Sequence, residues 1–128
     1  MTEDDLKRRT KEFALRVLKM AETLPDRGAG RVLSGQIMRS ATSVAANYRA
    51  VCRAKSRADF VSKLGMVEEE IDETAFWLEL TVDAGLLPWN RLAELRGEAD
   101  ELTAIFVRSL KTARDGRETP KSKLQNPK

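Results

Sequence analysis

Apolar residues recur along most of this chain at steps of three and four, and this spacing is the strongest constraint on its fold. Side chains spaced in this way share one face of an α-helix, because the helix makes one turn in about 3.6 residues. Four separate series occur. They are Leu6, Thr10, Phe13, Val17, Met20 and Leu24; Leu33, Ile37, Ala41, Val44, Tyr48 and Val51; Phe60, Leu64, Val67, Ile71, Thr74, Leu78 and Val82; and Leu92, Leu95, Ala99, Leu102, Phe106 and Leu110.

Residues that stop or start helices separate the four series. They are Pro25 and Gly28, Ser56 followed by Asp59, Gly85 followed by Pro88, and Gly116. Ser56 with Asp59 is typical of an N-cap, and Pro88 suits the first turn of a helix. Long amphipathic helices joined by short connections favour antiparallel neighbours. The sequence therefore predicts an all-α protein, an antiparallel up-down-up-down four-helix bundle, over residues 1–116.

The ends of the chain carry no apolar segment that suggests export or membrane insertion. Residues 1–12 are too polar for a signal peptide, and no apolar run approaches the length of about 20 residues that crosses a bilayer. Residues 117–128 are polar, contain two prolines and lack a core stripe, which predicts a disordered tail. A lone cysteine agrees with a reducing compartment. We expect a cytoplasmic protein without a membrane partner.

The chain contains no histidine. This removes histidine as a general acid or base, as the activator of a serine or cysteine nucleophile, and as a metal ligand. Glu69 with Asp72 or Glu73 resembles the carboxylates of di-iron bundles, but those sites draw carboxylates from all four helices and also use histidine. Cys52 beside Arg53 could be an activated thiol, although a small residue at the core edge is favoured. We predict no catalytic, cofactor or metal residues, no enzymatic activity and no small-molecule substrate.

Charge is divided unevenly between the two middle segments. Residues 31–57 carry six basic side chains and no acid, whereas residues 59–83 carry eight acids and one lysine. Pairing between two adjacent antiparallel helices is the favoured interpretation, with other chains or a nucleic acid as the alternative partners. Equal rise on the two helices places Arg39 at the height of Glu69, Glu70 and Glu73, and predicts a partly buried clasp there.

A second stripe, of short polar residues, follows the apolar one along residues 33–51. Its members are Gln36, Ser40, Ser43 and Asn47. With the glycine and alanines beside them, they predict a thin helix that packs closely either inside one bundle or against another subunit. The predicted polar network between helices or subunits comprises Gln36, Arg39, Ser43, Asn47, Glu69, Glu70, Asp72 and Glu73.

Phe76, Trp77 and Leu78 are three consecutive large apolar residues. A helix in one bundle cannot hide all three, because consecutive side chains point about 100° apart. Trp77 is therefore expected to be either partly exposed or buried between subunits, and burial between subunits is favoured. Phe76 and Trp77 are our candidate subunit interface.

Several stretches together resemble a known family. They are residues 36–50 (QIMRSATSVAANYRA), 55–60 (KSRADF), 63–65 (KLG), 67–74 (VEEEIDET) and 77–80 (WLEL). Over residues 10–112 the chain is similar to the bacterial 23S rRNA intervening-sequence protein family. The resemblance implies an up-down four-helix bundle that forms a ring-like homopentamer without known enzymatic activity. The accessory variability determinant proteins of diversity-generating retroelements, which are similar in fold, bind nucleic acid and a reverse transcriptase.

Two functional hypotheses follow. The first is a non-enzymatic homo-oligomer, a pentamer as the resemblance implies, that serves as a binding or scaffold subunit. The alternative is an RNA- or DNA-binding accessory protein that uses a basic rim and the tail. The rim residues are Arg49, Arg53, Lys55 and Arg57. The net charge of +3 at pH 7 is small for a nucleic-acid-binding protein, so this reading predicts weak binding without base specificity.

Overall fold

The computed structural model describes residues 1–116, and the predicted disorder of 117–128 lies outside these residues. Four α-helices occupy the described part of the chain, which contains no strand: α1 (Glu3–Ala21), α2 (Gly28–Val51), α3 (Arg57–Asp83) and α4 (Trp89–Arg114). The predicted all-α, four-helix fold is confirmed. None of these helices is both long enough and apolar enough to cross a membrane.

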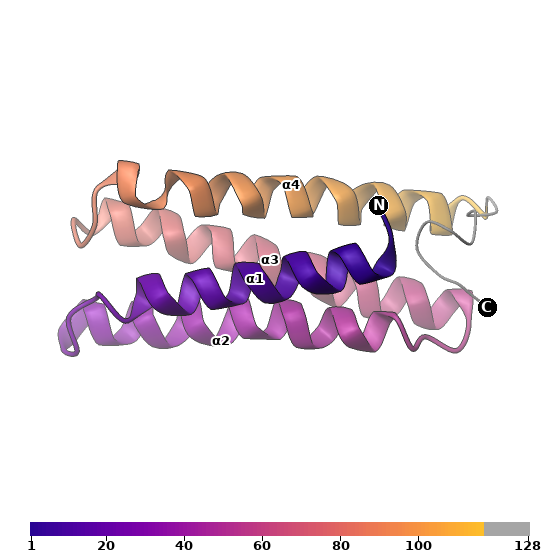
Figure 1. Ribbon diagram of the computed structural model, residues 1–128, viewed down its shortest axis with the longest axis horizontal. Coiled ribbons are helices and arrows are strands. Elements are labelled where there is room, and N and C mark those ends of the chain that lie inside the picture. The colour runs from indigo at the N-terminus through magenta and orange to yellow at the C-terminus, as the bar shows by residue number, and fades with distance from the viewer. Residues whose placement is uncertain (117–128) are drawn as a thin grey trace.

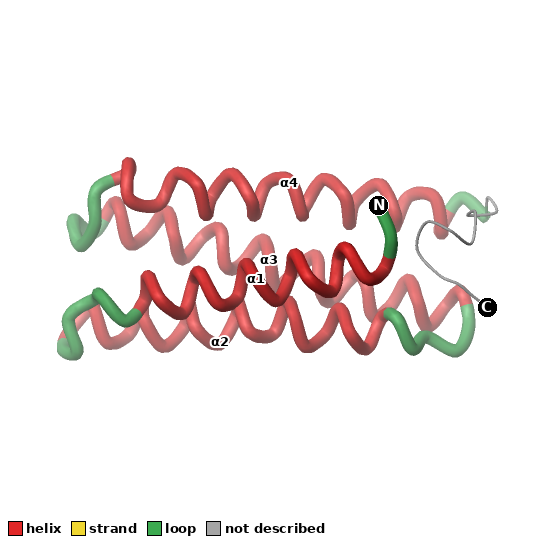
Figure 2. The backbone as a smooth tube through the Cα atoms, in the orientation of Figure 1, coloured by secondary structure: helices red, strands yellow, loops and turns green. Residues whose placement is uncertain are grey.

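The four helices lie side by side along one axis, with short loops at the two ends (Figures 1 and 2). Helix α2 packs between α1 and α3, and α3 packs against α4. The α1–α4 side makes the fewest contacts. Helices of this length joined by loops this short have to fold back on one another, so the arrangement is consistent with the predicted antiparallel order.

Local hydrogen bonds define where two helices begin. Thr2 caps α1, because its side chain accepts from the backbone N–H of Asp5 at 3.1 Å while the Asp5 carboxylate accepts from the backbone N–H of Thr2 at 2.9 Å. These bonds hold the pKa of Asp5 below its ordinary value. Ser56 caps α3 as predicted, accepting from the backbone N–H of Asp59 at 3.0 Å.

Other helix boundaries differ from the prediction by a few residues. Pro88 is the N-cap of α4, with an extended backbone, and is not part of its first turn. Helix α1 ends at Ala21, so Leu24 packs into the core from a loop. Gly85 and Gly116 follow α3 and α4 with φ of 77° and 74°, a left-handed conformation that glycine adopts without strain.

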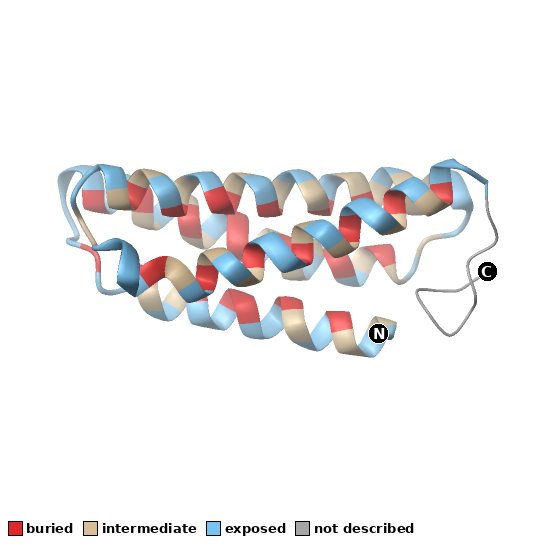
Figure 3. Cartoon of the chain, turned by 90° about the horizontal axis from the view of Figure 1, so that it is seen from above, coloured by how far each residue is buried: buried red, intermediate tan, exposed pale blue. Residues whose placement is uncertain are grey.

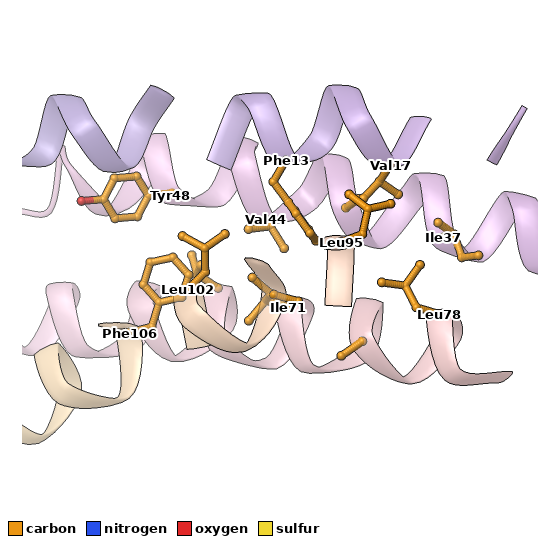
Figure 4. Close-up of a cluster of buried hydrophobic side chains, with 14 of the residues drawn as sticks. Phe13, Val17, Ile37, Val44, Tyr48, Ile71, Leu78, Leu95, Leu102 and Phe106 are labelled. Carbon is orange, nitrogen blue, oxygen red and sulfur yellow. The ribbon is translucent and has the colours of Figure 1, made fainter. Parts of the chain in front are cut away.

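The core runs the length of the bundle, and buried residues form stripes on the inner faces of the helices (Figures 3 and 4). Every member of the predicted second and fourth series is buried. Met20, Phe60 and Val82 are only partly buried, because they lie near helix ends. The Tyr48 ring stacks on that of Phe106 with centroids 5.9 Å apart, which ties α2 to α4 across the bundle.

Candidate assembly and binding surfaces

The predicted clasp between α2 and α3 forms at Arg39. Its guanidinium donates a hydrogen bond to Glu73 and lies 3.6 Å from Glu70 at its nearest approach. It also donates to the Gln36 side chain at 3.4 Å. Half of the Arg39 side chain is exposed, so water screens the pair and the clasp contributes to register more than to stability.

Glu70 is the least exposed charged residue of this cluster. One of its carboxylate oxygens is shielded from solvent. The distance from this oxygen to the Arg39 guanidinium is that of an ion pair and is too long for a hydrogen bond. Burial, and then repulsion from the neighbouring Glu73 carboxylate, raises the pKa of Glu70 above its ordinary value, while Arg39 opposes the change. A raised pKa means that the Glu70–Arg39 attraction weakens as the pH falls toward that pKa.

The structure divides the predicted polar stripe of α2 and the acids of the predicted network into inner and outer members. Ser40 is buried and its hydroxyl is hydrogen-bonded at 2.9 Å to that of Thr74 on α3, so this part of the stripe packs inside the bundle. Ser43 and Asn47 are partly buried. Glu69 and Asp72 point outward and do not join the Arg39 clasp. The rotation of α3 about its axis decides this, since it turns Glu70 and Glu73 toward α2.

Phe76 and Trp77 form an aromatic pair on α3, with ring centroids 5.1 Å apart in an edge-to-face arrangement. The Phe76 side chain is 51% exposed, whereas Trp77 is partly buried. The indole N–H of Trp77 is shielded from solvent and has no acceptor among residues 1–116. The pair is therefore a large apolar feature that is incompletely covered within one chain.

The predicted basic rim lies at the end of the bundle that holds the α2–α3 loop. Arg49, Arg53, Lys55 and Arg57 are all exposed. None of their side chains makes an ion pair within the described part of the chain. The end of α4 reaches the same end of the bundle, beside Arg57 (Figure 1). It adds three exposed basic residues that sequence reasoning did not include: Arg108, Lys111 and Arg114.

Ion pairs that join other helices were also missed, and two of them illustrate why. Arg9 on α1 donates to Glu98 on α4 at 2.7 Å and 3.0 Å, and to Glu101 at 3.1 Å. Arg96 on α4 pairs with Glu79 on α3. Neither pair has a sequence signal, because the partners lie on different helices whose relative rotation the spacing does not reveal.

Cys52 sits at the core edge beside Tyr48, as the favoured reading expected. Burial, followed by the nearby Glu3 carboxylate, raises the pKa of the Cys52 thiol above its ordinary value. Burial also raises the pKa of Tyr48. A thiol with a raised pKa is a weak nucleophile at neutral pH, so its surroundings do not activate Cys52. No group of three acids or cysteines within residues 1–116 is arranged to hold a metal ion.

The fold and these surfaces define a class of protein: a small all-α four-helix bundle whose distinctive features are charged and aromatic surfaces. The sequence profile of the 23S rRNA-intervening sequence protein family matches residues 3–108. The chain belongs to this family.

A solved structure supports the same assignment. It is the crystal structure of a protein of unknown function from the S23 ribosomal protein family of Bacteroides thetaiotaomicron. The two chains are 33% identical, with a TM-score of 0.77, and the match covers 83% of this chain and 98% of that one. No curated protein matches the sequence.

Proposed function

We propose that this protein is a non-enzymatic subunit that assembles with copies of itself into a ring and acts as a binding or scaffold body. The observation that carries the proposal is the aromatic pair of Phe76 and Trp77 on α3. Aromatic side chains are enriched at protein interfaces, where burial removes their large apolar area from water. A half-exposed phenylalanine beside a tryptophan is therefore a candidate contact between chains.

Further features support self-assembly without catalysis. Met66 lies on the same helix as Phe76 and is also 51% exposed, so α3 carries a second large exposed apolar side chain. The sequence has no histidine, and the carboxylates at the α2–α3 and α1–α4 contacts are engaged by Arg39 and Arg9. A ring of five chains is the assembly that the family resemblance implies.

The mass in solution tests this proposal. At micromolar concentration, light scattering after size-exclusion chromatography is expected to report about five times the chain mass of 14.4 kDa. Replacing Phe76 with serine is expected to lower that mass, because it removes exposed apolar area from the interface. Val107→Ser, at another exposed apolar position on α4, is the matched control and should keep the wild-type mass. A wild-type protein that remains a monomer would contradict the proposal.

Nucleic-acid binding is the second candidate, and the basic end of the bundle favours it. Rim residues Arg49, Arg53, Lys55 and Arg57 are exposed, and α4 adds Arg108, Lys111 and Arg114 beside them. A ring that repeats this end in every subunit would multiply a modest local charge. Such a surface would contact phosphates and carry little sequence preference.

Salt dependence tests this second candidate. Affinity for a single-stranded RNA is expected to fall steeply between about 50 and 200 mM salt, with a log–log slope near 0.7 per phosphate contacted. Changing Arg53 and Arg57 together to Glu should reduce both affinity and slope. The helices should survive, since an acid at the start of α3 complements the helix dipole, and circular dichroism checks this. Undetectable wild-type binding at about 50 mM salt, or unchanged affinity in the double variant, would reject the basic rim as a nucleic-acid site.

A further inference from the structure

The outer face of α2 is small and basic. We define it by Arg31, Val32, Gly35, Thr42, Ala46 and Arg49, all of which are exposed. Residues 27–58 contain no acid; Arg31 makes an exposed ion pair with Asp26 in the preceding loop, at 3.2 Å, whereas Arg49 makes no ion pair within residues 1–116. Val32 is 62% exposed, and a methyl group built at Gly35 meets no atom within 4 Å. This face therefore combines positive charge, an exposed apolar side chain and open room at a glycine.

The outer face of α3 has the opposite character. We define it by Met66, Glu69, Asp72, Phe76, Glu79 and Asp83, which are also exposed. It carries four acids and two large apolar side chains, with Phe76 near its middle. Glu69, Asp72 and Asp83 make no ion pair within residues 1–116. Its charge is therefore available to a partner outside the chain.

The two faces cannot satisfy each other within one molecule. Helices α2 and α3 are neighbours, and the contact between them uses Ser40, Thr74, Arg39 and Glu73. The residues of both outer faces remain exposed, and none of them forms a hydrogen bond or ion pair across that contact within residues 1–116. Arg49 on α2 and Asp72 on α3 are examples of opposite charges that have no ion-pair partner within their own described chain.

We propose that the outer face of α2 in one copy docks on the outer face of α3 in a second copy, with Phe76 seated against Gly35, where no side chain stands in its way. This inference rests on the proposed self-assembly and names the surfaces that carry it. The occupant is a second copy because one chain supplies both halves of the contact, opposite in charge and complementary in side-chain size. Opposite charges across an interface favour the correct partner and speed association.

Adding a large side chain at Gly35 is the sharpest test of this interface. Gly35→Leu is expected to reduce the scattering mass to that of a single chain at a concentration where wild type is assembled. The fold should survive, because Gly35 lies inside a helix with open space around it, and leucine is the better helix former. Gly97→Leu is the matched control, since Gly97 also lies inside a helix with nothing within 4 Å of a built methyl group. It should keep the wild-type mass.

Charge reversal provides an independent test with a rescue. With Phe76 at Gly35 and the two helices antiparallel, Arg31 lies on the side of Asp83 and Arg49 on the side of Glu69. Arg31→Glu with Arg49→Glu, or Glu69→Lys with Asp83→Lys, is therefore expected to dissociate the assembly, because like charges then face each other. All four changes in one chain restore opposite charges and should restore the assembled mass. Lys11→Glu with Lys19→Glu is the matched control, because both lysines are exposed on α1 and the change in charge equals that of the two arginine substitutions. It should leave the mass unaltered.

The results of these experiments distinguish a failure of this interface from a failure of self-assembly. A wild-type monomer overturns both self-assembly and this interface. An assembled wild type whose mass is unaffected by Gly35→Leu overturns the interface alone. The interface is also overturned if the variant with all four charge changes fails to reassemble while circular dichroism shows intact helices. Loss of mass in Gly35→Leu but not in Gly97→Leu, together with charge rescue, supports the interface.

Discussion

Replacing Phe106 with alanine is expected to lower the free energy of unfolding by about 3 to 5 kcal/mol. The Phe106 ring is 1% exposed and stacks on Tyr48, so the change removes buried apolar area and also leaves a cavity between α2 and α4. Close packing in the core limits how far the neighbours can collapse into that space. Urea unfolding followed by circular dichroism measures the loss, provided that the midpoint shifts while the slope stays constant.

The adjacent residue provides the control for this prediction. Val107 lies on the same helix but is 44% exposed, so Val107→Ala is expected to change the free energy of unfolding by less than about 0.5 kcal/mol. Both variants are compared with wild type at one chain concentration, because assembly links stability to concentration. A Phe106→Ala loss no larger than that of Val107→Ala would mean that the ring is not part of a packed core.

Gly30→Ala is expected to lower the free energy of unfolding by about 1 to 3 kcal/mol. Gly30 is buried in the first turn of α2, under the loop that leads from α1. A methyl group there would lie 2.3 Å from the backbone carbonyl oxygen of Pro25 and 2.9 Å from its ring. A backbone carbonyl cannot rotate away as a flexible side chain would, so the loop or the start of α2 has to move.

Gly97→Ala is the matched control, and its effect is expected to have the opposite sign. Gly97 lies in the middle of α4 with open space around it, so alanine should raise the free energy of unfolding by about 0.5 to 1 kcal/mol through helix propensity alone. The measurement is again urea unfolding at one chain concentration. Equal effects at the two glycines would show that the Pro25 contact does not constrain Gly30.

The candidate surfaces could be predicted in part from the sequence. The uneven charge of residues 31–57 and 59–83, together with equal helical rise, was enough to predict Arg39 opposite Glu70 and Glu73. The same argument also included Glu69, and the predicted polar network included Asp72, but both residues point outward. A register argument estimates height along the axis but not rotation about it, and rotation decides which of several adjacent acids meets the arginine.

Helix identity, inner faces and the Ser56 cap were determined by the sequence alone, because periodicity and capping involve residues only a few positions apart. Three features were decided only by the tertiary structure: the Arg9–Glu98 pair across α1 and α4, the entry of Leu24 into the core from a loop, and the close approach of Gly30 to Pro25. Each depends on how one segment is rotated and placed against another. At about 100° per residue, a shift of one position turns a side chain from the core toward solvent, and no local pattern records that placement.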